Sequence, residues 1–139
     1  GDVYKRQFLY HLCRSYSHQI PSASLTGSQR DLQRVTHVMN WVKVHYPEPL
    51  SLETAADSLA LSKEYFCRLF KKYTGQTFLE YLNDVRTMHL YEDLQNSDET
   101  ITVLMEKNGL SNYKIFMRTF KKLYGSTPQK MRSNRIRHV

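Results

Sequence analysis

Apolar and polar residues follow each other along most of this chain with the spacing of α-helices. Residues three and four positions apart share one face of a helix. This pattern predicts a helix over 31–46, whose apolar face carries Val35, Val38, Met39, Val42 and Tyr46. No stretch of any length alternates with the two-residue period of a β-strand, so we expect an all-α fold.

Caps and helix breakers divide the rest of the chain. Pro47 and Pro49 end the first helix, because proline cannot continue the backbone hydrogen bonds. Ser51 and Ser62 are placed as N-caps, and Thr77 with Glu80 fits a capping box. The remaining predicted helices are 52–60, 63–74, 77–95, 101–107, 112–124 and one that begins at Pro128.

One stretch of the chain occurs twice. Residues 62–77 recur about fifty positions later, with Arg68, Phe70, Lys71, Lys72, Gly75 and Thr77 repeated as Arg118, Phe120, Lys121, Lys122, Gly125 and Thr127. Such a repeat indicates two copies of one supersecondary unit. Each copy has a short helix, a tight turn and a helix with a basic outer face. This outline predicts helix-turn-helix units at about 51–75 and 100–125, joined by the helix at 77–95.

Residues 1–30 differ in character from 31–139. An apolar stripe at 4–16 is followed by a Ser-rich linker at 17–30, and we interpret residues 1–30 as the remnant of an upstream domain. A dimerisation helix and a frayed tail are the alternatives for the stripe. The second segment, 31–139, is expected to form the functional domain.

The charge balance favours an anionic partner. The chain has 139 residues, a net charge of +7 and a pI of about 9.5. Nucleic acid and an acidic membrane surface are the candidate partners, and a soluble basic protein is the alternative. The placement of basic residues on the outer faces of two helices and in the C-terminal tail favours an anionic partner. No apolar run approaches the ~20 residues of a membrane span. Because Cys13 and Cys67 form no disulfide framework, we expect a cytoplasmic protein.

The sequence lacks the patterns of an enzyme. Its six histidines are scattered without metal-ligand spacing, and no glycine-rich phosphate loop is present. Neither cysteine has a recognisable catalytic context. We therefore predict no catalytic activity, no cofactor and no metal.

These residues together resemble the DNA-binding domain of AraC/XylS-type bacterial transcription regulators, over about 33–133. The resemblance rests on Ser62, Tyr65, Arg68, Phe70, Lys71, Gly75, Phe78, Tyr81, Leu82, Arg86, Ile101, Gly109, Phe116, Arg118, Phe120, Lys121, Gly125, Thr127, Pro128 and Arg132. It implies two homeodomain-like helix-turn-helix units whose second helices enter adjacent major-groove segments. Activation and repression both stay open at this point, and RNA polymerase is the expected partner if the protein is an activator. A small-molecule effector is expected to act only through a missing upstream domain.

The chain departs from the family pattern at a few apolar positions. Met105 stands where the family usually has alanine, Leu110 where it has phenylalanine, and Met131 where it has an aromatic residue. Thr87 and Leu90 also differ from the usual pattern of the linking helix. We expect these positions to lie in the core and to repack it without changing the basic faces.

The outer faces of the two repeated helices supply the base-reading candidates. Arginine can donate two hydrogen bonds to guanine, which makes Arg68 and Arg118 the foremost of them. Glu64 has an alternative role, as the partner of Arg68 in an i, i+4 ion pair. The resemblance implies that the variable base-reading positions of the family lie on these faces. The full set of base-reading candidates is Glu64, Cys67, Arg68, Tyr113, Lys114, Met117 and Arg118.

Phosphate contacts are expected from the flexible point charges of lysine. The candidates are Lys71, Lys72, Lys121, Lys122 and Arg132. A disordered basic tail is the alternative for Arg132. The sequence thus predicts a sequence-specific DNA-binding transcription regulator. The alternative is a helical protein–protein adaptor in which one or both units have lost contact with DNA.

Overall fold

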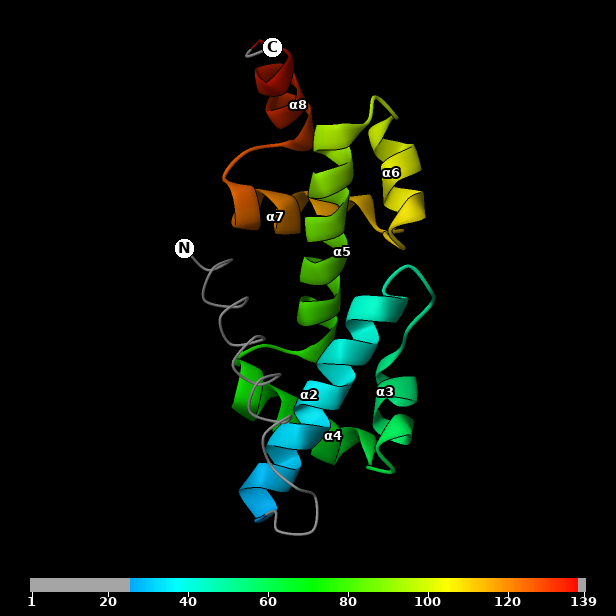
Figure 1. Ribbon diagram of the computed structural model, residues 1–139, viewed down its shortest axis with the longest axis vertical. Helices are drawn as coiled ribbons and strands as arrows, with labels where there is room; N and C mark the ends of the chain where they lie inside the picture. The colour runs from blue at the N-terminus through cyan, green and yellow to red at the C-terminus, as the bar shows by residue number, and fades with distance from the viewer. Residues whose placement is uncertain (1–25, 138–139) are drawn as a thin grey trace. The chain divides into compact units, whose positions relative to one another are not determined.

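The computed structural model describes residues 26–137, which fold into α-helices with no β-strand in that range (Figure 1). The predicted all-α fold is confirmed. The helices are α2 (Gly27–His45), α3 (Leu52–Ser58), α4 (Lys63–Thr74), α5 (Phe78–Asn96), α6 (Ile101–Lys107), α7 (Tyr113–Tyr124) and α8 (Pro128–Arg137).

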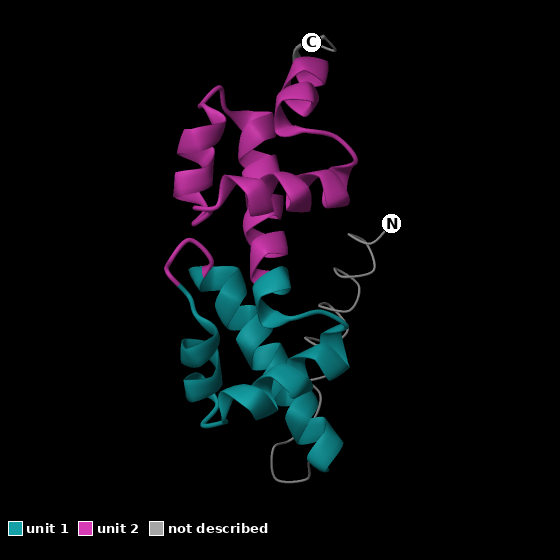
Figure 2. Ribbon diagram, turned by 180° about the vertical axis from the view of Figure 1, so that it is seen from behind, with its two compact units in different colours: residues 1–45, 50–81 teal, residues 46–49, 82–139 magenta. Residues whose placement is uncertain are grey.

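The described residues form two compact units, coloured separately in Figure 2. Unit 1 contains residues 26–45 and 50–81, and unit 2 contains residues 46–49 and 82–137. Each unit holds one helix-turn-helix pair, α3–α4 in unit 1 and α6–α7 in unit 2. Helix α5 starts in unit 1 and continues in unit 2.

Aromatic rings fill the core of unit 1. Phe66, Phe70 and Phe78 are almost fully buried, and their ring centroids lie 5.7–5.9 Å apart in tilted or edge-to-face contacts. Such contacts add to the free energy gained from burying the rings. They hold the inner face of α4 against the first turn of α5.

Unit 2 repeats this design with another set of residues. Its buried cluster consists of Leu90, Leu94, Leu104, Met105, Leu110, Phe116 and Phe120. Met131 is partly buried and packs against the cluster. The departures at Met105, Leu110 and Met131 therefore lie in or against the core, as expected.

In most places the helices begin at the predicted side-chain caps and end at the predicted glycines. Ser62 accepts a hydrogen bond from the Tyr65 amide, and Gly75 and Gly125 end α4 and α7 in the left-handed conformation. Thr77 accepts from the Glu80 amide at 3.1 Å. The structure places a full reciprocal capping box between Ser51 and Thr54, a pair that the sequence analysis did not single out.

Helix α2 begins at Gly27, inside the segment that was predicted to be a linker. The reason is a second capping box. The Gln29 amide donates to Thr26 Oγ1 at 3.2 Å, and the Thr26 amide donates to Gln29 Oε1 at 2.8 Å. The predicted boundary at residue 30 therefore falls within a helix, and the predicted helix at 4–16 lies outside the described residues.

A short segment after α2 packs within unit 2. Arg86 of α5 donates from Nε to the Tyr46 carbonyl at 2.6 Å and from Nη2 to the Glu48 carbonyl at 2.7 Å. The Tyr46 ring stacks on His89 with centroids 4.0 Å apart. Burial lowers the pKa of Arg86 and is the main cause that raises the pKa of Tyr46. The two carbonyls therefore satisfy donors of an arginine that is partly withdrawn from water.

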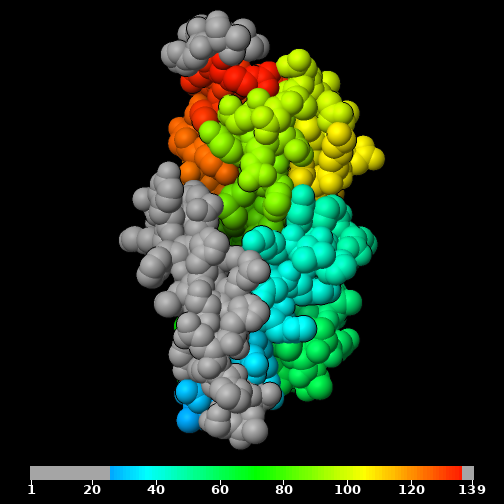
Figure 3. Space-filling model, viewed as in Figure 1, coloured from blue at the N-terminus to red at the C-terminus, as the bar shows by residue number. Residues whose placement is uncertain are grey.

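Figure 3 shows one face of the chain in space-filling form, coloured by residue number. A few large apolar side chains are exposed. Val44 of α2 is 70% exposed and Val103 of α6 is 40% exposed. No helix among residues 26–137 is long and apolar enough to cross a lipid bilayer.

Candidate nucleic-acid interface

The interface candidates lie on α4 and α7, the second helix of each helix-turn-helix pair. Both helices have twelve residues, a polar N-cap, buried phenylalanines on one face and two lysines in the last turn. The caps and the cores orient the helices, so that their outer faces remain in solvent. The positive charge of these faces is therefore presented on rigid elements.

On α4, the three base-reading candidates Glu64, Cys67 and Arg68 are all exposed. Within the described residues, Glu64 and Arg68 form no ion pair with each other, which leaves both side chains directed to solvent. Lys63 at the start of α4 pairs with Glu53 of α3 at 3.2 Å. That pair links the two helices at the edge of the face.

On α7, Tyr113, Lys114 and Arg118 are exposed, and Tyr113 is 54% accessible to solvent. Met117 behaves differently. It is partly buried and packs against the apolar cluster of unit 2. We predicted Met117 to be a base reader on the outer face, but the structure places it on the flank next to the core. It follows the buried Phe116 directly and lies three residues before the buried Phe120.

The lysine candidates divide into two groups. Lys71, Lys72 and Lys121 are exposed, and Lys72 Nζ lies 5.4 Å from the centroid of the Tyr73 ring. Lys122 is exposed as well, yet its Nζ forms an ion pair with Asp84 Oδ1 of α5 at 3.2 Å. The two last-turn lysines that repeat each other, Lys72 and Lys122, thus have different surroundings.

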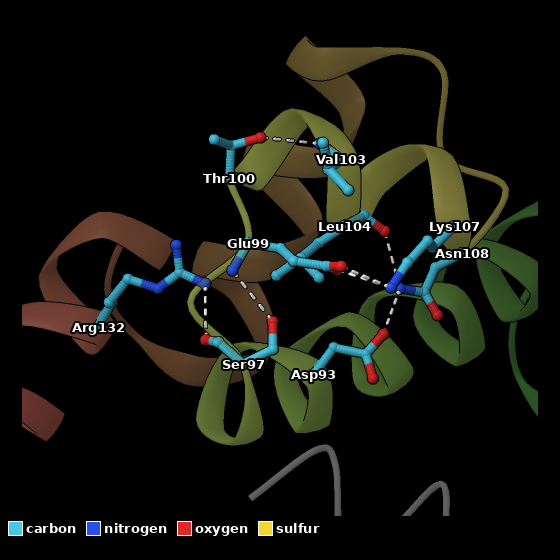
Figure 4. A network of polar contacts seen from close by, with 9 residues as sticks. All are labelled: Asp93, Ser97, Glu99, Thr100, Val103, Leu104, Lys107, Asn108 and Arg132. Carbon is cyan, nitrogen blue, oxygen red and sulfur yellow. Dashed lines mark hydrogen bonds and ion pairs between the residues drawn. The ribbon is translucent and has the colours of Figure 1, made fainter.

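Arg132 is directed at protein rather than at solvent. Its Nη2 donates to the Ser97 carbonyl at 3.3 Å, at the end of α5 (Figure 4). Arg135 donates from Nη1 to the Leu94 carbonyl at 2.7 Å and to the Ser97 carbonyl at 3.1 Å. Helix C-termini leave carbonyls unpaired and carry partial negative charge, so they attract cations. These contacts give Arg132 a structural role that its prediction as a phosphate ligand did not include.

A polar network fixes α6 against α5 (Figure 4). Asn108, which is 2% exposed, donates from Nδ2 to Asp93 Oδ2 at 2.9 Å and to the Leu104 carbonyl at 2.8 Å. Lys107 Nζ lies 2.7 Å from Glu99 Oε2. A buried side-chain amide whose hydrogen bonds are satisfied stabilises one arrangement of the surrounding helices. The network therefore supports the turn that precedes α7.

Two tyrosines of α4 reach the first turns of α2. The Tyr65 hydroxyl donates to Asp31 Oδ1 at 3.3 Å, and the Tyr73 hydroxyl donates to the Ser28 carbonyl at 3.3 Å. Asp31 also pairs with Arg34 at 3.1 Å. The sequence analysis did not identify Asp31 as part of the site. Nothing in local spacing links residues 34 positions apart.

Comparison with known proteins agrees with this geometry. Residues 55–134 match a protein-family model described as a helix-turn-helix domain. An uncharacterized HTH-type transcriptional regulator of Staphylococcus aureus (strain MSSA476) is 30% identical over 132 residues, which is 94% of this chain and 18% of that protein. The HTH-type transcriptional activator RhaS of Escherichia fergusonii is 31% identical over 111 residues, covering 80% of this chain and 40% of its own length.

The chain therefore spans less than half the length of these curated relatives. Among solved structures, the DNA-binding domain of AdpA, described as a global transcriptional factor in complex with a target DNA, is similar with a TM-score of 0.65. It shares 25% identity, with 72% of this chain and 90% of that chain covered. The family model covers more than half of the chain, and the AdpA domain has a similar fold. The chain belongs to the AraC/XylS-type helix-turn-helix transcriptional regulators, a family of DNA-binding proteins and not of enzymes.

Proposed function

We propose that this chain binds double-stranded DNA in a sequence-specific manner and regulates transcription. The observation that carries the proposal is the repetition of one surface, since α4 and α7 each present exposed arginine and lysine on a helix fixed by a buried aromatic core. A helix of this size fits the major groove, where base edges can be read. The DNA complex of the AdpA domain supports the same use of the fold.

Within this proposal the exposed side chains have distinct roles. Arg68 and Arg118 read base edges, since both project from the middle of the outer face and neither is held by an acid in the described part of the chain. Glu64, Cys67, Tyr113 and Lys114 lie beside them and adjust the base preference. Lys71, Lys72 and Lys121 neutralise phosphates.

The wider setting of the protein belongs to the same proposal. As a regulator of bacterial genes it acts in the cytoplasm, where the chromosome is. The name of RhaS, a transcriptional activator, supports activation as the role of this chain. RNA polymerase is then the expected protein partner. A small-molecule effector would act through a domain outside the residues present here, since the relatives are much longer than this chain.

A salt titration tests DNA binding against the adaptor alternative. Binding to a duplex selected from random sequence should weaken steeply as salt rises, because each phosphate contact releases counterions. A preferred duplex should bind at least ~10³-fold more tightly than unrelated DNA. An adaptor without DNA contact would show neither the salt dependence nor a selected sequence.

A further inference from the structure

The repeated lysines Lys72 and Lys122 differ in a way that the repeat does not predict. Both occupy the last turn of the second helix of their unit. The Lys72 ammonium lies 5.4 Å from the Tyr73 ring centroid. The Lys122 ammonium lies 3.2 Å from the carboxylate of Asp84, which is on α5 within the same unit.

The surroundings of Asp84 make this pair more than a surface contact. The Asp84 side chain is 2% exposed, whereas that of Lys122 is 39% exposed. A buried carboxylate is costly unless a cation and hydrogen bonds compensate its charge, and removing one partner leaves the other uncompensated. Lys122 therefore stays close to Asp84. Its ammonium remains partly exposed to solvent, but the buried carboxylate of Asp84 offsets its positive charge.

This offset matters for binding to a polyanion. The salt dependence of DNA binding counts the phosphates neutralised by protein cations. A lysine that is already paired with a buried carboxylate neutralises little phosphate charge, because the carboxylate offsets its positive charge in the free protein. The carboxylate also restrains the lysine side chain from reaching outward.

We infer that Asp84 is a positioning residue that withholds Lys122 from the DNA backbone, so that unit 2 makes one phosphate contact fewer than unit 1 at this repeated position. The inference rests on the proposed DNA binding. Lys72 is then a phosphate contact and Lys122 is not, although sequence alone places them together. Unit 1 would hold the duplex more firmly at this end of its helix.

The test compares matched variants of the full chain on a preferred duplex over a range of salt concentrations. Lys72→Gln should lower the slope of log K against log salt by about 1, whereas Lys122→Gln should leave it unchanged. Asp84→Asn keeps the size of the side chain and frees Lys122. Asp84→Asn should raise the slope by about 1. Its gain in affinity over the unchanged chain should therefore be about three- to fourfold larger at 50 mM salt than at 200 mM salt. Adding Lys122→Gln to Asp84→Asn should remove that gain.

Equal loss of slope in Lys72→Gln and Lys122→Gln would overturn the inference, and so would an Asp84→Asn protein with an unchanged slope. A second readout needs no DNA. Labelling of lysine amines with an acylating reagent, followed by mass spectrometry, should modify Lys122 more slowly than Lys72, and Asp84→Asn should remove the difference. Equal labelling in the unchanged chain would also overturn the inference. A chain that binds no duplex at any salt concentration would instead overturn the proposed function, while the labelling still decides whether Asp84 restrains Lys122.

Discussion

At the scale of single residues, the two arginines at the centre of the outer faces carry the proposed specificity. Arg68 and Arg118 are exposed and repeat each other, and the planar guanidinium can donate two parallel hydrogen bonds to guanine. Their neighbours differ, with Glu64 and Cys67 in one unit and Tyr113 and Lys114 in the other. The two units are therefore expected to prefer different bases.

Replacing Arg118 by alanine should weaken binding to the preferred duplex by about 1–3 kcal/mol and relax the preference at one base pair. The loss has this size because two hydrogen bonds to one base disappear together. Competition between the preferred duplex and single-base variants of it measures the effect. Equal weakening on preferred and random DNA would instead identify Arg118 as a phosphate contact.

The turns inside the two units also differ at the residue scale. Ala60 between α3 and α4 has a φ of +55°, while the corresponding turn between α6 and α7 has Gly109 with a φ of +78°. A Cβ on Gly109 would lie 2.9 Å from the Pro47 carbonyl oxygen and 3.0 Å from Arg86 Nε. Glycine is needed at 109 for space as well as for conformation.

Substitutions in these two turns should change the free energy of unfolding in opposite directions. Ala60→Gly should raise the free energy of unfolding by roughly 0.5–1 kcal/mol, because it relieves a left-handed alanine. Gly109→Ala should lower it by about 2 kcal/mol or more, since strain and a steric overlap add. Chemical denaturation of the chain measures both.

Gly75→Ala is the control, because its φ is also +78° while nothing lies within 4 Å of an added Cβ. It should lower the free energy of unfolding by only about 1 kcal/mol. A Gly109→Ala protein no less stable than Gly75→Ala would show that segment 46–49 does not confine this turn.

At the scale of helices, α4 and α7 share their length, a polar N-cap, a glycine C-cap and their last-turn lysines, but the contacts of individual side chains differ. In both, the last turn contains a lysine at the same repeated position, Lys71 in α4 and Lys121 in α7. Each is exposed. Neither has an acidic partner of the kind that Lys122 has in the described residues.

The double variant Lys71→Ala/Lys121→Ala should therefore weaken binding to preferred and random duplexes alike and lower the salt slope by about 2, roughly 1 for each lost phosphate contact. Equilibrium titrations at several salt concentrations measure the slope. A slope equal to that of the unchanged chain would exclude both lysines from the interface.

Most helices could be predicted from local sequence, because their ends depend on neighbouring residues. Helices α4 and α6 begin and end where the caps predicted, and α7 starts one residue later than expected. The early start of α2 was missed, since the capping pair Thr26 and Gln29 lies in a stretch whose composition is that of a linker. The helix at 4–16 lies outside the described residues and stays a prediction.

The exposure of Arg68 and Arg118 could be predicted from helical spacing, whereas Met117 was wrongly placed on the outer face and contacts with tertiary partners could not be predicted. Spacing placed Arg68 and Arg118 on the outer faces, where the structure has them. It could not show that Asp84 approaches Lys122 from another helix, or that Arg132 turns to the end of α5. Those contacts join residues 38 and 35 positions apart, beyond the reach of any local pattern.

At the scale of the whole molecule, one chain carries both of the helices that we propose read base edges, and their outer faces differ. A monomer should therefore recognise a non-palindromic site of two different boxes. If both helices enter the major groove on one face of the duplex, the centres of the boxes lie about 10–10.5 bp apart. Where α5 imposes a shorter spacing, the DNA has to bend, at an elastic cost that depends on its sequence.

Footprinting of the monomeric chain on a selected duplex examines this prediction. Two protected groove segments on one face are expected, and changes in either box should weaken binding. Protection of a single segment, or of a symmetric palindrome by a dimer only, would contradict the two-box arrangement and favour a single reading unit.

Segment 46–49 has a consequence for how this protein can be divided. It lies between α2 and α3 in the sequence, yet the carbonyls of Tyr46 and Glu48 accept hydrogen bonds from Arg86 within unit 2. No single cut of the backbone can release unit 2 complete: a fragment that starts at α5 leaves Arg86 without two acceptors, and one that starts at Tyr46 carries most of unit 1 with it. A fragment that starts at α5 is therefore expected to be less stable than the same residues within the full chain.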